Sequence, residues 1–346
     1  MAILLDCTFR DGGYQTGWHF DDAFLAAYLA VTRSLDLGII EIGYMRSTPS
    51  QPPGAGDFAG LPESLTPQQS ALLRRVERPR LAIMVDAADL PDTGTSVHAA
   101  TIMQRIVSSG IPISVIRIAT RMPHLARAVA YARAFAEHGV GIIVNLMQAA
   151  DLSAQDLGRK LPTVIGDTPL AAFYVADSFG RMTPADVAHL VGTLAQVLPV
   201  PLGFHAHDNC GLAVANATAA SAAGARYLDA TMGGLGRGAG NAQMESLRLV
   251  TGSPPAEAAL VGLELFLAEQ IEPLHARANW GASALYRRQA RTGLHPTYAQ
   301  RIAEDAQLDE AARLALLARL AKTGQPGRFD ADALAEARRA ISGEAA

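Results

Sequence analysis

Two histidines separated by a single residue are the strongest chemical signal in this chain. They lie in the segment GFHAHDN at residues 203–209. Side chains at positions i and i+2 of a β-strand face the same way, so His205 and His207 would present two imidazoles in one direction. With one carboxylate, such a pair forms a three-ligand set for a divalent ion and leaves coordination positions open to substrate. The alternative for an isolated pair is two rings that only hydrogen-bond at the rim of the fold.

The N-terminal segment LLDCTFRDGGY, at residues 4–14, contains the carboxylates that could complete this set. We predict a strand over Ile3–Phe9, which would carry Asp6, Thr8 and Arg10 on one face. A carboxylate inside an apolar strand needs polar partners if it is buried. The segment therefore indicates a functional cluster more than a surface turn.

Asp11 follows this predicted strand, and Gly12-Gly13 would make a turn. In a closed parallel barrel the first strand lies beside the last one, so Asp11 could reach the same ion as His205 and His207. The alternative is that Asp11 pairs with the preceding arginine at the surface.

Two further segments extend the cluster. Glu41, in the apolar segment IIEIGYM, would be a buried charge in the second strand, and an ion pair with Arg10 would satisfy it. The glycine-rich segment GGLGRGAGN, at residues 233–241, follows the eighth predicted strand, where barrels often bind anionic groups through backbone amides. Asn241 could supply an oxygen ligand or a hydrogen bond beside the ion, or it could cap a helix.

Short, nearly continuous apolar runs are typical of parallel strands that are buried on both faces. They predict eight strands, at Ile3–Phe9, Ile39–Met45, Leu81–Asp86, Val115–Ala119, Gly141–Leu146, Ala172–Asp177, Leu202–His207 and Tyr227–Thr231. Helical patterns separate them, which favours a (β/α)8 TIM barrel over residues 1–255. The rival fold is a doubly wound open sheet, although no G-x-G-x-x-G motif follows a strand near the start.

Helical segments continue beyond the predicted barrel, at Gly262–Ala276, Asp309–Lys322 and Asp330–Ile341, so we expect a C-terminal helical region over residues 256–346. The segment 47–66 is rich in Pro, Gly and Ser and follows the second strand. It could form a lid over the site or a disordered loop.

Composition excludes several classes of function. The chain has 346 residues, 49% of them hydrophobic, and a formal net charge of −4. Because no block of like charge stands out, we expect no nucleic-acid or membrane partner. Cys7 and Cys210 form no disulfide framework or zinc motif, and no signal segment or long apolar run is present, so we expect a cytoplasmic protein.

Taken together, these residues resemble the DRE-TIM metallolyase superfamily, the HMG-CoA lyase-like enzymes, and within it the 4-hydroxy-2-oxovalerate aldolase-like members. The resemblance covers about residues 3–250 and is carried by DCTFRDG, IIEIGY, VADSFGRMTP, GFHAHDNCGLAVANA and DATMGGLGRGAGNA. It implies that Arg10, Asp11 and Glu41 form the signature of the family. The implied metal ligands are Asp11, His205 and His207, with Asn241 as a further or water-mediated ligand. The ion would be Mn²⁺ or Mg²⁺, with Co²⁺ and Zn²⁺ as other possibilities.

The chemistry implied by the resemblance is that of an enolate beside a carbonyl group. A 2-oxo acid and an aldehyde would be the substrates of a metal-dependent aldolase, with Arg10 stabilising the developing charge. Asp177, Ser178 and the loop residue Gly236 occupy family positions near the substrate. One alternative is a Claisen-type acyltransferase that condenses an acyl-CoA with a 2-oxo acid, as isopropylmalate and homocitrate synthases do. Another is a metal-binding barrel without catalysis that serves as a partner subunit.

The general base is the point where the sequence departs from the family pattern. Familiar aldolases of this type have a histidine three residues after the motif aspartate, and this chain has Tyr14 there. His19 lies close by, and the segment TGLHPTY offers His295 as a base and Tyr298 as a substrate contact. Alternatively, His295-Pro296 simply begins a helix. The helical tail would support a homodimer or, as in the catabolic aldolases, a partner dehydrogenase.

Overall fold

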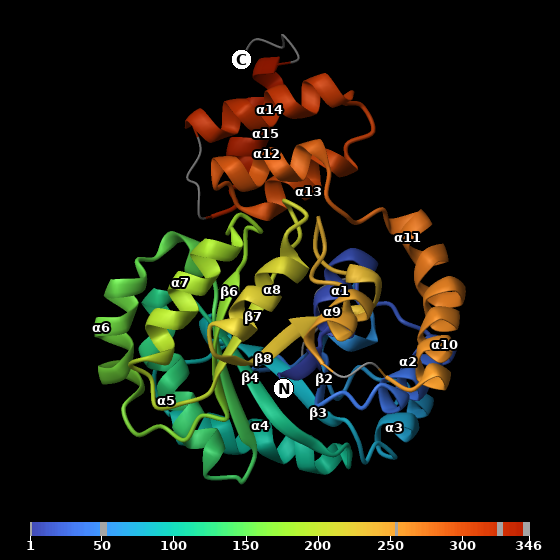
Figure 1. Ribbon diagram of the computed structural model, residues 1–346, viewed down its shortest axis with the longest axis vertical. Coiled ribbons are helices and arrows are strands. Elements are labelled where there is room, and N and C mark those ends of the chain that lie inside the picture. The colour runs from blue at the N-terminus through green and yellow to red at the C-terminus, as the bar shows by residue number, and fades with distance from the viewer. Residues whose placement is uncertain (1, 49–53, 253–254, 324–327, 342–346) are drawn as a thin grey trace.

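The computed structural model describes residues 2–48, 54–252, 255–323 and 328–341 (Figure 1). Its centre is a closed barrel of parallel strands in the order β1 to β8, with β8 paired back to β1. The strands are β1 Ile3–Asp6, β2 Ile39–Tyr44, β3 Arg80–Asp86, β4 Ile113–Thr120, β5 Gly141–Leu146, β6 Ala172–Asp177, β7 Leu202–Ala206 and β8 Ala225–Ala230. The predicted (β/α)8 barrel is therefore confirmed.

Helices follow the strands and form the outer layer of the barrel (Figure 1). The barrel helices are α1 Thr8–Thr16, α2 Asp22–Ser34, α3 Pro67–Leu73, α4 Thr95–Ser109, α5 Leu125–Ala136, α6 Ala154–Ile165, α7 Pro184–Ala195, α8 Ala213–Ala222 and α9 Met244–Thr251. The predicted cap at Thr183 is confirmed, because its hydroxyl accepts from the backbone N–H of Asp186 and Pro184 begins α7.

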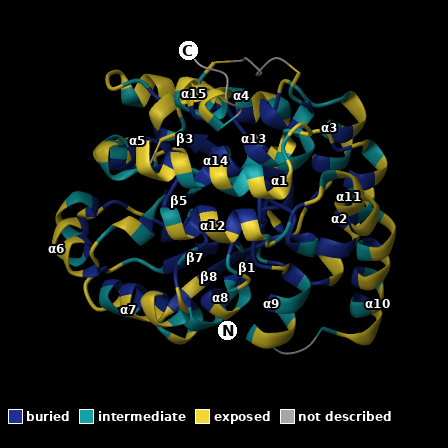
Figure 2. Ribbon diagram, turned by 90° about the horizontal axis from the view of Figure 1, so that it is seen from above, coloured by how far each residue is buried: buried dark blue, intermediate teal, exposed yellow. Residues whose placement is uncertain are grey.

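The barrel core explains why its strands lack alternating polarity. Every residue of β2 and β6 is buried, because helices cover the outer face of the barrel while side chains fill its interior. Figure 2 shows the central strands in the colour of buried residues, inside the surrounding helices. No helix among the described residues is long and apolar enough to cross a membrane.

The predicted first strand was too long. β1 ends at Asp6, and α1 begins at Thr8, so Asp6, Thr8 and Arg10 do not share a strand face. Arg10 and the residues after it are helical and buried through Gly13. The expected turn at Gly12-Gly13 is also wrong, because both glycines lie inside this helix.

Close packing explains the two glycines. A Cβ atom on Gly12 would lie 2.6 Å from the Leu235 side chain, and one on Gly13 would lie 2.1 Å from the Trp18 ring. The helix therefore has glycine at these positions because neighbouring side chains press against its backbone. Gly17, with a φ of 64°, then ends the helix in the left-handed conformation.

The segment 47–66 was expected to form a lid or a disordered loop. Within it, residues 49–53 lie outside the described residues. The single turn Asp57–Ala59 buries Phe58, whose ring lies 4.5 Å from that of Phe9 between ring centroids. This part of the predicted lid is thus packed into the hydrophobic core.

The C-terminal region has two parts (Figure 1). α10 Glu257–Phe266, the π-helical turn Leu267–Ile271 and α11 Glu272–Ala278 run along the side of the barrel, where Phe266 packs on Phe24 and Tyr28. α12 Ala284–Thr292, α13 Pro296–Glu304, α14 Glu310–Thr323 and α15 Ala331–Ile341 form a second hydrophobic cluster above the barrel. The expected C-terminal helices are present. α12 was not expected, and α13 was expected only through the possible helix start at His295-Pro296.

Candidate active site

Three predicted metal ligands converge where the strands end. His205 lies on β7, His207 directly follows that strand, and Asp11 lies on the first turn of α1. One ligand atom from each of these residues lies within 4.8 Å of the other two, and all three side chains are buried. The geometry brings together residues that are almost 200 positions apart in the sequence.

Hydrogen bonds fix the orientation of both imidazole rings. Nδ1 of His205 donates to Asp229 Oδ2 over 2.9 Å, and Nδ1 of His207 donates to the carbonyl oxygen of Gly240 over 3.2 Å. Because these partners only accept, each neutral ring has its proton on Nδ1 and an Nε2 lone pair free to bind a cation. The Nε2 atom of His205 lies 4.0 Å from Asp11 Oδ2.

The electrostatics favour the protonation states that metal binding needs. Burial lowers the pKa of His207 to about 3, so its ring is neutral. Burial alone would raise the pKa of Asp11, but the Arg10 guanidinium and both imidazoles hold it well below its usual range. A deprotonated carboxylate and a neutral imidazole are the forms that bind cations.

Asn241 and Gly236 complete the immediate surroundings of Asp11. Nδ2 of Asn241 donates to Asp11 Oδ2 over 2.5 Å, while its buried Oδ1 has no hydrogen-bond partner in the protein. A Cβ atom on Gly236 would lie 2.2 Å from Asn241 Nδ2 and 3.1 Å from Asp11 Oδ2. Only glycine therefore fits at position 236 without moving the site, and Asn241 does not cap α9, which starts at Met244.

The predicted ion pair between Arg10 and Glu41 is confirmed. Nε of Arg10 donates to Glu41 Oε2 over 2.7 Å, and its Nη1 donates to Asp11 Oδ1 over 2.5 Å. The remaining nitrogen, Nη2, is buried without a partner in the protein. An unsatisfied guanidinium nitrogen beside the three convergent ligands is suited to an anionic substrate oxygen.

Two charged residues that the sequence analysis missed extend this network. Arg117, on β4, is fully buried and donates to Glu41 Oε2 over 2.9 Å and to Asp229 Oδ2 over 2.7 Å. Its guanidinium also lies 4.7 Å from the centre of the Tyr174 ring. Arg117 thus links the carboxylate that holds Arg10 to the one that orients His205. A charge inside an apolar strand, the signal used for Glu41, would also have identified Arg117 and Asp229.

A cleft of about 400 Å³ lies above the network, between the ends of the strands and the C-terminal helices. Its walls contain Tyr14, Asp86, Arg121, Met147, Gln148, Ser178, Phe179, Arg237, His295, Pro296, Thr297, Arg328 and Phe329. Arg237 connects the cleft with the ligand cluster, because its charge helps to lower the pKa of Asp11 and of His207.

Two of the three candidate bases line this cleft. Tyr14 forms a hydroxyl–hydroxyl hydrogen bond of 2.9 Å with Tyr44. His295 caps α13, with Nδ1 accepting from the backbone N–H of Thr297, so the predicted helix start is confirmed. His19 is exposed instead, with Nε2 3.2 Å from the carbonyl oxygen of Gly54, and it does not line the cleft.

Of the predicted substrate contacts Asp177, Ser178 and Tyr298, only Ser178 lines the cleft. Ser178 lines the cleft, and its Oγ accepts from the backbone N–H of Gln148. Asp177 is buried behind it, where its carboxylate accepts from the backbone N–H groups of Arg181 and Met182. Tyr298 is also fully buried, and its hydroxyl accepts from the backbone N–H of Asp330. The prediction that Tyr298 contacts substrate is therefore wrong, because the side chain packs inside the helical cluster.

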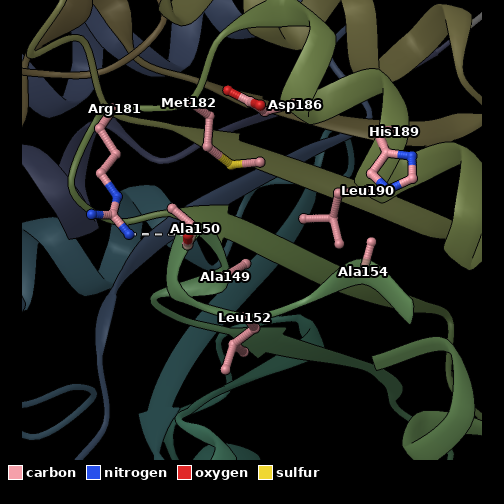
Figure 3. Close-up of a pocket in the computed structure, with 9 residues that line it drawn as sticks. All are labelled: Ala149, Ala150, Leu152, Ala154, Arg181, Met182, Asp186, His189 and Leu190. Carbon is pink, nitrogen blue, oxygen red and sulfur yellow. Dashed lines mark hydrogen bonds between the residues drawn. The ribbon is translucent and has the colours of Figure 1, made fainter. Parts of the chain in front are cut away.

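A second cavity, of about 300 Å³, lies between the turn after β5 and α7 (Figure 3). Ala149, Leu152 and Leu190 supply much of its lining, and its arginine, Arg181, is already paired with Asp151. It contains none of the convergent ligands, so the cleft at the barrel mouth is the candidate active site.

Known proteins with similar sequences include aldolases. The chain is 30% identical over 244 residues to the 4-hydroxy-2-oxovalerate aldolase of Pelotomaculum thermopropionicum, covering 70% of this chain and 68% of that one. It is 30% identical over 251 residues to the enzyme of the same name from Burkholderia pseudomallei, covering 71% and 67%.

A solved structure of the N-terminal domain of a candidate aldolase from Bacteroides vulgatus superposes with a TM-score of 0.74 at 28% identity, covering 88% of this chain and 97% of that one. The carboxyl transferase domain of Rhizobium etli pyruvate carboxylase shares the fold at 16% identity, with a TM-score of 0.72, over 99% of this chain and 61% of that one. The HMGL-like family matches residues 2–253, which include every ligand described above, and the chain belongs to this family.

Proposed function

We propose that this chain is a divalent-metal-dependent aldolase that cleaves or forms a 4-hydroxy-2-oxo acid through a pyruvate-type enolate. The observation that carries the proposal is the convergence of Asp11, His205 and His207 beside an arginine, Arg10, with one unsatisfied nitrogen. The names of the similar proteins support the reaction class.

The residues present fit a divalent ion. Two Nε2 lone pairs and an ionised carboxylate point to one place, and the unpartnered Oδ1 of Asn241 is a fourth possible donor. Carboxylate and imidazole donors suit Mn²⁺, Mg²⁺, Co²⁺ or Zn²⁺. When bound, the ion would act as a Lewis acid toward the 2-oxo carboxylate of the substrate.

The protein groups divide the remaining tasks. Arg10, fixed by Glu41 and Asp11, offers Nη2 to the oxygen on which negative charge develops. Cleavage breaks the C3–C4 bond, and the 4-hydroxyl proton must leave at the same time. We assign that proton transfer to Tyr14, whose phenolate oxygen would accept the proton in cleavage and whose hydroxyl would donate it back to the aldehyde oxygen in addition. Tyr14 lines the cleft, and its hydroxyl is hydrogen-bonded to that of Tyr44. His295 has its Nδ1 engaged with Thr297, so its neutral ring presents an N–H donor to the cleft.

Deuterium exchange at the methyl group of pyruvate tests the proposal before any aldehyde is known. We expect NMR to show exchange with Mn²⁺ or Mg²⁺, loss of exchange with EDTA, and its return when the ion is restored. In a second assay, 4-hydroxy-2-oxovalerate should release pyruvate under the same conditions. Thiol release from acetyl-CoA and a 2-oxo acid would instead support the acyltransferase, and metal binding without exchange would support a non-catalytic subunit.

We also predict a homodimer and binding to a partner dehydrogenase. The mass of the protein alone in solution tests the first, and its mass when mixed with a candidate dehydrogenase tests the second.

A further inference from the structure

The arginines of the cleft differ from other arginines near the barrel mouth. Arg46, Arg105 and Arg181 each pair with a carboxylate, of Asp89, Glu63 and Asp151 respectively. Arg121, Arg237 and Arg328 line the cleft, and none of the three forms an ion pair within the described chain. The cleft therefore concentrates three guanidinium groups that form no ion pair with a carboxylate of the described residues.

The position of Arg237 shows that this charge faces the cleft interior. Its guanidinium lies 5.6 Å from the centre of the Tyr14 ring, and its Nε is buried without a hydrogen-bond partner in the protein. A buried guanidinium nitrogen without a partner is costly unless a ligand supplies an acceptor. Tyr14 thus lies beside a group that can bind an anion.

The other polar groups of the cleft do not cancel this charge. Asp86 is the one carboxylate among the described residues that line the cleft, and its single negative charge, which interacts with Arg121, offsets only one of the three positive charges. Ser178 and His295 are neutral, and His295 directs an N–H toward the cleft. Burial together with Arg237 and Arg121 lowers the pKa of His295 to about 4, which agrees with a positive field at that ring.

We infer that the aldehyde half of the substrate bears an anionic group, a carboxylate or a phosphate, which Arg121, Arg237 and Arg328 hold in the cleft. The inference rests on the proposed aldolase function and specifies its acceptor. The carboxylate of pyruvate needs one partner at most beside the ion, whereas three free guanidinium groups match a second anion. Arg328 comes from the C-terminal region, so the helices above the barrel contribute to specificity.

In the addition direction, C3 of pyruvate loses a proton and forms a bond to the aldehyde carbon, whose oxygen takes up a proton to become the 4-hydroxyl. No oxidant, reductant or further reactant is needed. The anionic group stays unchanged throughout, so its only role is to bind.

Three aldehydes of matched length test the inference in this direction, with pyruvate and Mn²⁺. They are butanal, 4-oxobutanoate and 3-oxopropyl phosphate, which carry a neutral, a carboxylate and a phosphate terminus. We expect kcat/KM to be at least about tenfold higher for one anionic aldehyde than for butanal, as charge-assisted hydrogen bonds would give. The more reactive of the two anionic aldehydes identifies the group. Equal or better use of butanal would overturn the inference.

Charge-removing variants locate the effect. Arg328→Gln, at an exposed position, should lower the preference for the anionic aldehyde over butanal at least about fivefold, because it removes one charge-assisted contact. Arg301→Gln is the matched control, since Arg301 lies in the same helical region but pairs with Glu304. An equal loss for all three aldehydes in Arg328→Gln would contradict the inference.

Pyruvate exchange separates this inference from the proposed function. Exchange without any preference for anionic aldehydes would overturn only the inference, whereas absence of exchange would overturn both. A higher KM for pyruvate in the exchange reaction of Arg121→Gln, with the aldehyde preference unchanged, would mean that the arginines hold the carboxylate of pyruvate, and the inference would be wrong.

Discussion

In the barrel mouth, charged side chains from α1, β2, β4 and β8 and an imidazole from β7 are buried and paired with one another. In the cleft above them, three arginines form no ion pair with a carboxylate of the described residues. The side chains of the paired network are each fixed in one orientation, because each forms an ion pair or hydrogen bond with at least one neighbour. The unpaired arginines leave binding capacity for a ligand. Under the proposed function, the barrel would fix the reaction and the cleft would select the substrate.

The largest expected effect tests whether the network is a single buried unit. Arg117→Met removes one ion-pair partner from each of the carboxylates of Glu41 and Asp229. Because breaking a buried ion pair is strongly destabilising, we expect the free energy of unfolding to fall by ~3–5 kcal/mol. Urea denaturation would measure this loss. Arg301→Met, which removes an exposed pair with Glu304, should cost less than ~1 kcal/mol. Similar losses in both variants would remove the distinction between network and surface.

Arg10→Gln tests the catalytic end of the network. Removing a group that stabilises developing negative charge lowers rates by ~10²–10³, so pyruvate exchange should fall by that factor. Mn²⁺ should still bind, since Asp11, His205 and His207 are retained, and calorimetric titration would show it. An exchange rate within about tenfold of the parent chain would refute the assigned role of Arg10.

Tyr14→Phe tests the boundary between the two regions, because Tyr14 lines the cleft and belongs to the helix that carries Asp11. Loss of a proton-transfer group lowers rates by at least ~10², so cleavage of 4-hydroxy-2-oxovalerate should fall by that much. Pyruvate exchange should fall less, since it involves no 4-hydroxyl proton. Equal losses in the two assays would argue against the proton assignment.

Asp229→Asn tests a residue that acts through His205. The amide no longer supports the Nδ1–H form of the ring with a negative charge, and such changes lower metal affinity by ~10–100-fold. Calorimetric titration with Mn²⁺ measures the change. Glu245→Gln is a control, because Glu245 is largely buried and accepts from the backbone N–H of Gly233 but contacts no ligand. Unchanged Mn²⁺ affinity in Asp229→Asn would mean that His205 needs no orienting partner.

The smallest expected effect concerns the cleft and the pH dependence of stability. His295 has a pKa of about 4 in the folded chain and ~6.5 when unfolded, so the unfolded chain binds more protons between these values. Its contribution to the unfolding free energy is therefore complete above pH ~6.5 and is lost as the pH falls toward 4.

His295→Gln should reduce the slope of unfolding free energy against pH within this interval. Asp6 has a pKa raised by burial to about 6 and contributes a slope of the opposite sign, but it is present in both chains and cancels in the difference. Identical slopes in the two chains, measured by urea denaturation at several pH values, would show that the ring is not held neutral by the cleft.

Much of this molecule could be predicted from local sequence. Apolar runs buried on both faces indicated the parallel barrel, and the bounds of β5 and β6 agree with the prediction. The pair His205 and His207 is readable because i and i+2 share a strand face. Asp11 was also expected as their partner. The predicted backbone around it was wrong, because Asp11 lies inside helix α1 and not between a strand and a turn.

The end of β1 shows why the rest could not be predicted in this way. Apolar residues and glycines around Phe9 fit either a strand with a turn or a helix, and the deciding contacts come from Leu235 and Trp18, one of them more than 200 positions away. Likewise, Arg117 pairs with residues 76 positions before it and 112 positions after it.

The sequence by itself indicated which side chains could bind a divalent ion, because residue type and strand periodicity are local properties, and its resemblance to the DRE-TIM superfamily implied that Arg10 stabilises an enolate. Only the tertiary structure decided how those side chains are held and what lies above them. Closure of the barrel brings Arg117 between Glu41 and Asp229, and the return of the C-terminal helices brings His295 and Arg328 to the cleft. Both depend on contacts between distant segments, and the free energy of such contacts exists only after the chain has folded.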